Sequence, residues 1–130
     1  MTVRIEDFGG KQEARNLSEY EAALESRFGP RRNGFWIWHE EEIYPALSLL
    51  VAGELATILY FPFDGHPGFA SDGKIEGLDK HGSTIFSFDR IEQEQEFPNY
   101  QVVPLVAAMS AAKEFFASKQ LPTSIEWNEL

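Results

Sequence analysis

The clearest pattern in the chain is a pair of apolar runs near its middle. Residues 46–51 (ALSLLV) and 54–61 (ELATILYF) are apolar at successive positions, which is typical of strands covered on both faces. The dipeptide between them, Ala52-Gly53, favours a tight turn. The two runs therefore predict a β-hairpin at the centre of a sheet.

Further strand patterns surround this hairpin. Residues 35–38 (FWIW) are aromatic or β-branched, and alternation along a strand places Trp36 and Trp38 on one face and Phe35 and Ile37 on the other. One of these two faces must meet the core. The other predicted strands are residues 2–6, a segment near Phe69, residues 83–88 and residues 123–127.

A first helix is predicted after the Gly9-Gly10 pair. Ser18 and Glu21 have the spacing of a capping box, in which each side chain satisfies the other residue's free backbone N–H. Gly29-Pro30 ends this helix. Its apolar face has the spacing i, i+4, i+8 and consists of Tyr20, Leu24 and Phe28.

A second helix begins near Pro104, because proline is tolerated in the first helical turn. Leu121-Pro122 ends it. Its apolar stripe consists of Leu105, Met109, Ala112 and Phe116. Two amphipathic helices and about six strands, mostly joined as hairpins, predict an α+β fold with an antiparallel-dominated sheet.

The length of 130 residues indicates one domain. Charged residues are nevertheless distributed unevenly along the chain. Residues 1–34, the N-terminal strand and helix flank, hold six acids and six bases. Residues 35–130, which contain the sheet and the C-terminal helix, hold fifteen acids and five bases, so the formal charge of −10 belongs to this second part. Such a balance argues against a protein that wraps nucleic acid, because basic groups are needed to displace phosphate counterions.

The acidic segments have two interpretations. One is an ordinary solvated face, and the other is a surface that attracts a basic protein and rejects wrong partners. A partner would meet the HEEE segment at 39–42, the Pro- and Gly-rich loop over 64–69 and the acidic run over 89–96. The candidate contact residues are Trp38, Glu40, Glu41, Glu42, Asp64, His66, Phe69, Asp89, Glu92, Glu94 and Glu96.

Motifs for catalysis and metal binding are missing from the sequence. Cysteine is absent, which excludes a disulfide framework, a thiolate metal site and a cysteine nucleophile. His39 is followed at i+4 by Ile43 and therefore lacks the second histidine of a zincin motif. No GxSxG elbow or phosphate-binding loop occurs. We therefore expect no enzyme activity, no catalytic residue, no cofactor and no metal.

The N-terminus, MTVRIEDFGG, has no basic stretch followed by an apolar run. No segment approaches the roughly 18 consecutive apolar residues of a membrane span. The sequence thus predicts a cytoplasmic protein without a membrane or nucleic-acid partner, either a monomer or a weak homodimer.

Three stretches of the chain together resemble a known family. They are the double apolar run LSLLVAGELATILYF, its continuation YFPFDGHPGFAS, and the C-terminal block VPLVAAMSAAKEFFASKQLPTSIEWNEL. Their order and spacing resemble immunity protein family one of bacterial polymorphic toxin systems, over roughly residues 46–130. The first 34 residues carry no part of the resemblance.

The resemblance implies a binding protein without an active site. Its partner would be the C-terminal domain of a cognate toxin, often a nuclease or a nucleic-acid deaminase. Toxins that act on nucleic acid tend to be basic at the substrate cleft. An acidic, aromatic-rich surface that occludes the toxin's active site would fit such a partner.

Two other functions remain open from the residues alone. An aromatic-lined pocket beneath Trp36, Trp38 and Tyr60 would favour a small-ligand-binding or regulatory domain, whereas a flat acidic face would favour the immunity function. A carboxylate-based hydrolase would need two close acids with well-separated pKa values, and nothing in the sequence nominates such a pair.

Overall fold

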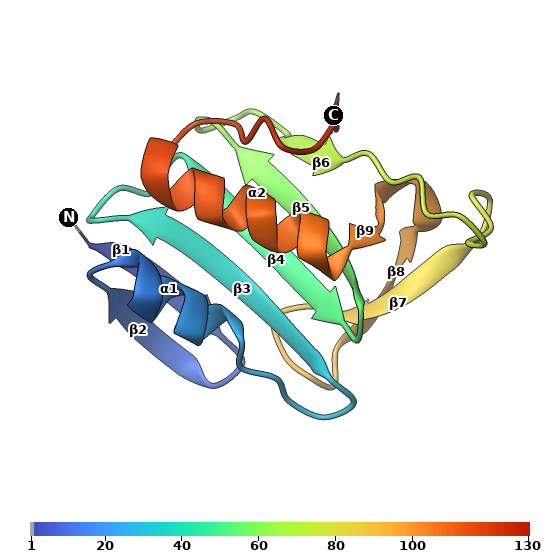
Figure 1. Ribbon diagram of the computed structural model, residues 1–130, viewed down its shortest axis with the longest axis horizontal. Helices are drawn as coiled ribbons and strands as arrows, with labels where there is room; N and C mark the ends of the chain where they lie inside the picture. The colour runs from blue at the N-terminus through green and yellow to red at the C-terminus, as the bar shows by residue number, and fades with distance from the viewer. Residues whose placement is uncertain (1) are drawn as a thin grey trace.

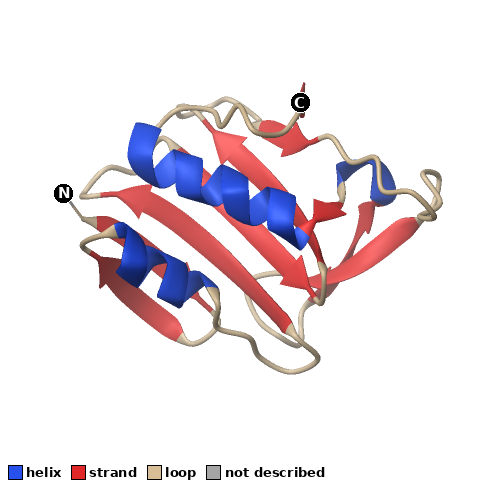
Figure 2. Ribbon diagram, in the orientation of Figure 1, coloured by secondary structure: helices blue, strands red, loops and turns tan. Residues whose placement is uncertain are grey.

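The fold is a sheet with both helices on one face and a separate hairpin against the other face (Figures 1 and 2). The computed structural model describes residues 2–130. Helix α1 spans Leu17–Leu24 and helix α2 spans Leu105–Ser118, with a short 3-10 turn at Asn99–Gln101. The α+β class predicted from the sequence is confirmed.

Within the described residues, the main sheet has eight strands: seven in the order β10-β6-β5-β4-β3-β1-β2, and the short β9, which also pairs with β5. Every pairing is antiparallel. Strands β7 and β8 form the separate hairpin. The strands are β1 Val3–Asp7, β2 Gly10–Ala14, β3 Arg32–His39, β4 Ala46–Ala52, β5 Leu55–Phe61, β6 Phe69–Ser71, β7 Ser83–Ser87, β8 Glu94–Pro98, β9 Val103–Pro104 and β10 Trp127–Glu129.

The predicted central hairpin is confirmed as β4 and β5. Gly53 adopts a φ of 62° at its turn, a conformation that glycine accepts without strain. All residues of β4 except the last are buried, because α2 lies on one face and the β7–β8 hairpin covers part of the other. The apolar residues on both faces of β4 are therefore buried by two different elements, α2 on one face and the β7–β8 hairpin on the other.

The larger core lies between the sheet and the two helices. Phe35 and Ile37 of β3 point into it together with Phe115 of α2, so this face of β3 is the buried one. A smaller core on the opposite face joins Leu50 of β4 to Phe86 of β7 and to Val102. This second core covers only one end of the helix-free face.

The number of strands corrects the prediction, because residues 2–130 form ten strands where about six were expected. Strands β2 (GKQEA) and β8 (EQEFP) are mostly polar and exposed, so their sequences lack the apolar pattern by which strands are recognised. The last strand is Trp127–Glu129 rather than residues 123–127. Thr123 and Ser124 instead donate hydrogen bonds to the Glu114 carboxylate of α2.

The first helix starts earlier than predicted. Its N-cap is Asn16, whose side-chain oxygen accepts from the backbone N–H of Glu19 at 2.9 Å, and not Ser18. The Glu19 carboxylate in turn accepts from the backbone N–H of Arg15 at 2.7 Å. Phe28 lies beyond the helix, where it bridges to Arg32. The second helix ends at Ser118, because Lys119 adopts a left-handed conformation before Leu121-Pro122 is reached.

Candidate interaction surface

Two rows of side chains cross the helix-free face of the main sheet. The strand register places Glu6, Trp36, Ser48 and Leu59 side by side in one row. The second row consists of Arg4, Trp38, Ala46 and Phe61. Because directly opposed residues in neighbouring strands point to the same side, the two tryptophans lie together on the face opposite to Phe35 and Ile37.

The aromatic side chains of these rows form a continuous apolar surface with two residues of the loop between β3 and β4. This surface, here called the aromatic patch, consists of Trp36, Trp38, Ile43, Tyr44 and Phe61. The two indoles are stacked with centroids 6.1 Å apart, and the Phe61 ring lies 5.7 Å from Trp36. The patch lines an open hollow of about 200 Å³. Ile43 is 68% exposed, so part of this surface faces water in the free protein.

Arg4 covers one end of the aromatic patch. Its guanidinium carbon lies 5.1 Å from the centre of the Trp38 ring, in a cation–π arrangement. The same guanidinium donates hydrogen bonds to the backbone carbonyls of Glu40 and Glu42. Arg4 therefore ties the 40–45 loop to the sheet and already occupies the face of Trp38.

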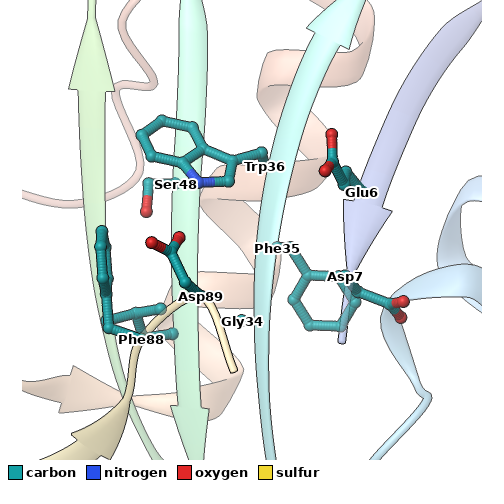
Figure 3. Close-up of a pocket in the computed structure, with 9 residues that line it drawn as sticks. Glu6, Asp7, Gly34, Phe35, Trp36, Ser48, Phe88 and Asp89 are labelled. Atoms are coloured by element: carbon teal, nitrogen blue, oxygen red, sulfur yellow. The ribbon is translucent and has the colours of Figure 1, made fainter. Parts of the chain in front are cut away.

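A smaller cavity of about 60 Å³ lies beside Trp36, where the loop after β7 approaches β3 (Figure 3). In Figure 3 the Asp89 carboxylate extends toward Trp36 and Ser48, and Phe88 forms the neighbouring wall. Asp7 points away from them. Its carboxylate accepts from the Gly9 N–H at 2.8 Å and from the Asn33 amide at 3.1 Å, so it holds the local backbone.

The predicted acidic residues differ in whether a basic side chain neutralises them. Glu42 pairs with Lys119, Glu94 pairs with Arg32 at 2.7 Å and Glu92 lies 3.8 Å from Arg90. Glu96 accepts from the Ser83 hydroxyl at 3.1 Å. The remaining predicted acids, Glu40, Glu41, Asp64 and Asp89, are exposed and make no ion pair within residues 2–130.

His66 and Phe69 have structural contacts within the predicted loop. The Nδ1 atom of His66 accepts from the Gly68 N–H at 2.8 Å, and its Nε2 lies 2.8 Å from the Glu129 carboxylate. Its ring stacks on Phe69 with centroids 5.0 Å apart, and Phe69 packs against the larger core. These contacts fix the loop and the C-terminal strand to the edge of the sheet.

The three predicted contact segments do not form one cluster. The segment 39–42 begins at the last residue of β3, and the segment 64–69 connects β5 to the first residue of β6. Because β4 runs antiparallel to both β3 and β5, the two segments lie at the same end of the sheet. The acidic run at 89–96 belongs to the β7–β8 hairpin and approaches the start of β3 near Gly34. The aromatic patch lies between the two regions and connects them.

The aromatic pocket expected for a ligand-binding domain is not formed as predicted. Tyr60 pairs with Leu47 and Phe69 and belongs to the larger core, whereas Trp36 and Trp38 lie on the opposite face of the sheet. A one-residue difference in strand position separates Tyr60 from Phe61, which does join the tryptophans. The sequence analysis named Trp36 only as part of a ligand pocket and did not name Phe61 or Glu6. Their shared face follows from the strand register.

Comparison with known proteins identifies the family. The family model for Immunity protein Imm1 matches residues 13–129. The chain belongs to the Imm1 family. The resemblance found in the sequence is thereby confirmed, and the match also includes most of the N-terminal flank.

A relative is named for the toxin it counteracts. The Imm1 chain is 28% identical over 125 residues to the double-stranded DNA deaminase immunity protein of Burkholderia cenocepacia (strain H111). The aligned part covers 96% of this chain and 98% of the relative. As an immunity protein, the Imm1 chain binds and neutralises a toxin, which confirms the predicted function.

Two further structural findings concern metals and membranes. Among residues 2–130, no three His, Asp or Glu side chains are placed to hold a metal ion together. No helix in this part of the chain has the length and apolarity needed to cross a membrane.

Proposed function

We propose that this Imm1 protein binds the C-terminal domain of a deaminase toxin that acts on DNA and covers its active site. The relative that counteracts a double-stranded DNA deaminase supports the choice of toxin class. A toxin that brings nucleic acid to its active site needs basic groups along the path of the phosphates. A partner with an acidic surface can compete for those groups.

The observation that carries this proposal is the position of uncompensated carboxylates around the aromatic patch. Seven of the eleven basic side chains make ion pairs within residues 2–130: Arg15, Arg31, Arg32, Lys74, Arg90, Lys113 and Lys119. Glu40 adjoins Arg4 beside Trp38, Asp89 lines the cavity beside Trp36, and neither carboxylate makes an ion pair within residues 2–130. A basic protein would therefore meet an apolar centre with an acidic rim, which is the usual anatomy of a specific interface.

In this proposal the protein acts by binding alone, as one domain, without a catalytic step, a cofactor or a metal. It works in the cytoplasm, where the toxin would otherwise reach DNA, and it is a monomer or weak homodimer before it binds. The contact residues proposed from the sequence are Trp38, Glu40, Glu41, Glu42, Asp64, His66, Phe69, Asp89, Glu92, Glu94 and Glu96.

The test is co-expression with the C-terminal domain of the protein encoded directly upstream. Growth rate, uracil content of the DNA and co-purification are measured with and without the Imm1 protein. We expect restored growth, suppressed deamination and a stable complex. An unrelated acidic protein of similar charge serves as the control. Toxicity and deamination that persist beside well-expressed, folded Imm1 protein, with no complex formed, would contradict the proposal and favour a ligand-binding function.

A further inference from the structure

We infer that the helix-free face of the sheet is the centre of the toxin interface, and that an arginine of the toxin enters the cavity between Trp36 and Phe88 with Asp89 and Glu6 as its counter-ions. The inference rests on the proposed function, since it assigns the residues with which the toxin is held.

The helix-free face is only half covered. At one end, Phe86 and Val102 pack on Leu50 and exclude water from it. At the other end, no helix or strand of residues 2–130 packs over Trp36, Trp38 and Phe61, which are partly buried, and Arg4 alone lies over Trp38. The exposed Ile43 and Tyr44 extend the same apolar surface. A contiguous apolar patch of this kind on a small protein marks a contact surface, and tryptophan is the residue type most enriched among binding hot spots.

The cavity beside Trp36 has the volume of a guanidinium group. Its 60 Å³ provides room for about four or five water-sized groups. A guanidinium has four heavy atoms in one plane, and this plane stacks well on an indole face. The Trp36 and Phe88 rings supply apolar walls, Ser48 supplies a hydroxyl, and the carboxylate of Asp89 extends toward the indole (Figure 3).

The neighbouring tryptophan already holds a guanidinium in this way. Arg4 lies over Trp38, with its centre 5.1 Å from the ring, and backbone oxygens of the next loop accept its hydrogen bonds. Trp36 lies in the adjacent row of the same face, and no cation lies over its ring among residues 2–130. An arginine from the partner would repeat on Trp36 the arrangement that Arg4 makes on Trp38.

The charges select the partner. Glu6 and Asp89 line the cavity and make no ion pair with any residue of the described chain, 2–130. A second copy of this protein would bring its own charge of −10 and the same two carboxylates against this face. Like charges at an interface are strongly unfavourable, whereas a basic toxin surface complements them. The occupant is therefore the toxin and not another Imm1 chain.

The test measures the dissociation constant for a catalytically inactive C-terminal domain of the upstream-encoded toxin. Asp89→Asn removes only a charge, and asparagine accepts the left-handed backbone at this position, where φ is 63°. We expect it to weaken binding about tenfold at low salt. Trp36→Ala removes the stacking surface and should weaken binding about thirtyfold or more, the loss typical of a hot spot.

Two control variants match these changes on the helix-covered side. Glu25→Gln removes one carboxylate from an exposed position at the end of α1, and Val106→Ala trims a side chain that is 75% exposed on α2. Each should alter the dissociation constant by less than about threefold, since changes outside the binding centre are nearly neutral. Thermal unfolding of all four variants confirms that each is folded before binding is compared.

A double-mutant cycle then identifies the toxin residue. Each arginine of the toxin domain is replaced by alanine in turn. Against one of these toxin variants, Asp89→Asn should no longer change the dissociation constant, which identifies the arginine that pairs with Asp89. Tight binding by wild type and by both Trp36→Ala and Asp89→Asn would overturn the inference while the proposed function stands. Failure of wild-type protein to bind and protect would overturn the proposed function itself. A free protein that dimerises through Trp36, with toxin affinity unchanged in Trp36→Ala, would also contradict the inference.

Discussion

The most unusual single residue in the protein is His39, at the end of β3. Its side chain is 1% exposed, and its Nε2 lies 3.0 Å from the backbone carbonyl of Phe116. A carbonyl only accepts, so Nε2 carries the hydrogen. Its Nδ1 is buried without a hydrogen-bond partner among residues 2–130, and the ring packs edge-on against Phe115. Protonation of this buried imidazole would therefore destabilise the folded state.

His39 predicts that the protein loses stability in mild acid. Burial lowers its pKa below the ordinary 6.5, with the nearby Lys119 ammonium acting in the same direction and the Phe116 hydrogen bond opposing both. The unfolded chain therefore binds a proton at a higher pH than the folded chain. The stabilisation is complete above about pH 6.5 and declines as the pH falls from there toward the lower folded-state pKa.

The measurement is the free energy of unfolding in urea from pH 7.5 to pH 5. We expect the decline with acidity to be smaller in His39→Gln than in the wild type, because glutamine does not titrate. His81→Gln makes the same substitution at an exposed position and should keep the wild-type slope. Equal slopes in wild type and His39→Gln would show that His39 does not control this dependence.

Tyr20 gives a second prediction at the residue scale. Its side chain is fully buried, which raises its pKa, and its hydroxyl donates to the Ala112 carbonyl of α2 at 2.7 Å. Tyr20→Phe keeps the ring and removes this link between the helices, so unfolding should require about 1 to 2 kcal/mol less. Urea unfolding with an unchanged slope measures the loss. Tyr100→Phe, at a tyrosine that is 52% exposed, should leave stability unchanged.

At the scale of elements, one carboxylate joins α2 to the segment that follows it. The Glu114 side chain accepts from the Thr123 N–H and hydroxyl and from the Ser124 N–H, at 2.7 to 3.1 Å. The hydrogen bonds from Thr123 lower the pKa of this carboxyl below its ordinary value. This connection directs the chain from α2 toward β10, where Trp127 donates to the Pro122 carbonyl at 2.7 Å.

We expect Glu114→Gln to loosen this segment without unfolding the domain. A neutral amide has one acceptor oxygen and binds N–H donors more weakly than a carboxylate. The amide hydrogens of Thr123 and Ser124 should therefore exchange faster with solvent at neutral pH, while those of β4 and β5 keep wild-type protection. Glu126→Gln, whose carboxylate pairs with exposed Lys74 instead, serves as the control. Unchanged exchange at Thr123 and Ser124 would show that the Glu114 contacts do not hold the segment.

Elements with an apolar face could be predicted from sequence, and polar elements could not. The β4–β5 hairpin, β3 and α2 follow from patterns that reflect burial, whereas β2 exposes four of its five residues and is defined only by its pairing with β1. The start of α1 was misplaced because Asn16-x-x-Glu19 and Ser18-x-x-Glu21 have the same capping spacing. The choice between them depends on the chain that precedes the helix.

The candidate surface was predictable only in part for a related reason. Alternation showed that Trp36 and Trp38 share a face, but it did not show which face the helices would cover. The cavity beside Trp36 combines residues of β1, β3, β4 and the loop after β7, so it depends on the packing of the β7–β8 hairpin. No local pattern in the sequence predicts how this hairpin packs against the sheet.

At the scale of the whole molecule, the charge of −10 acts before any contact is made. The acid excess lies in residues 35–130, where Glu40 adjoins Arg4 beside Trp38 and Asp89 lines the cavity beside Trp36. Opposite charges accelerate association because they guide the two proteins toward productive encounters. Salt shortens the range of this attraction from about 30 Å at 0.01 M to about 3 Å at 1 M.

We therefore expect the association rate constant with the toxin domain to fall at least about tenfold between about 0.02 M and about 0.5 M salt. The dissociation rate constant should change much less, since the aromatic patch makes the apolar contacts that persist in salt. Stopped-flow measurements that follow tryptophan fluorescence can separate the two rates. Asp89→Asn should reduce the salt dependence of association, whereas Trp36→Ala should mainly accelerate dissociation. An association rate unchanged by salt would remove electrostatic attraction from the mechanism and leave the apolar contacts as the basis of recognition.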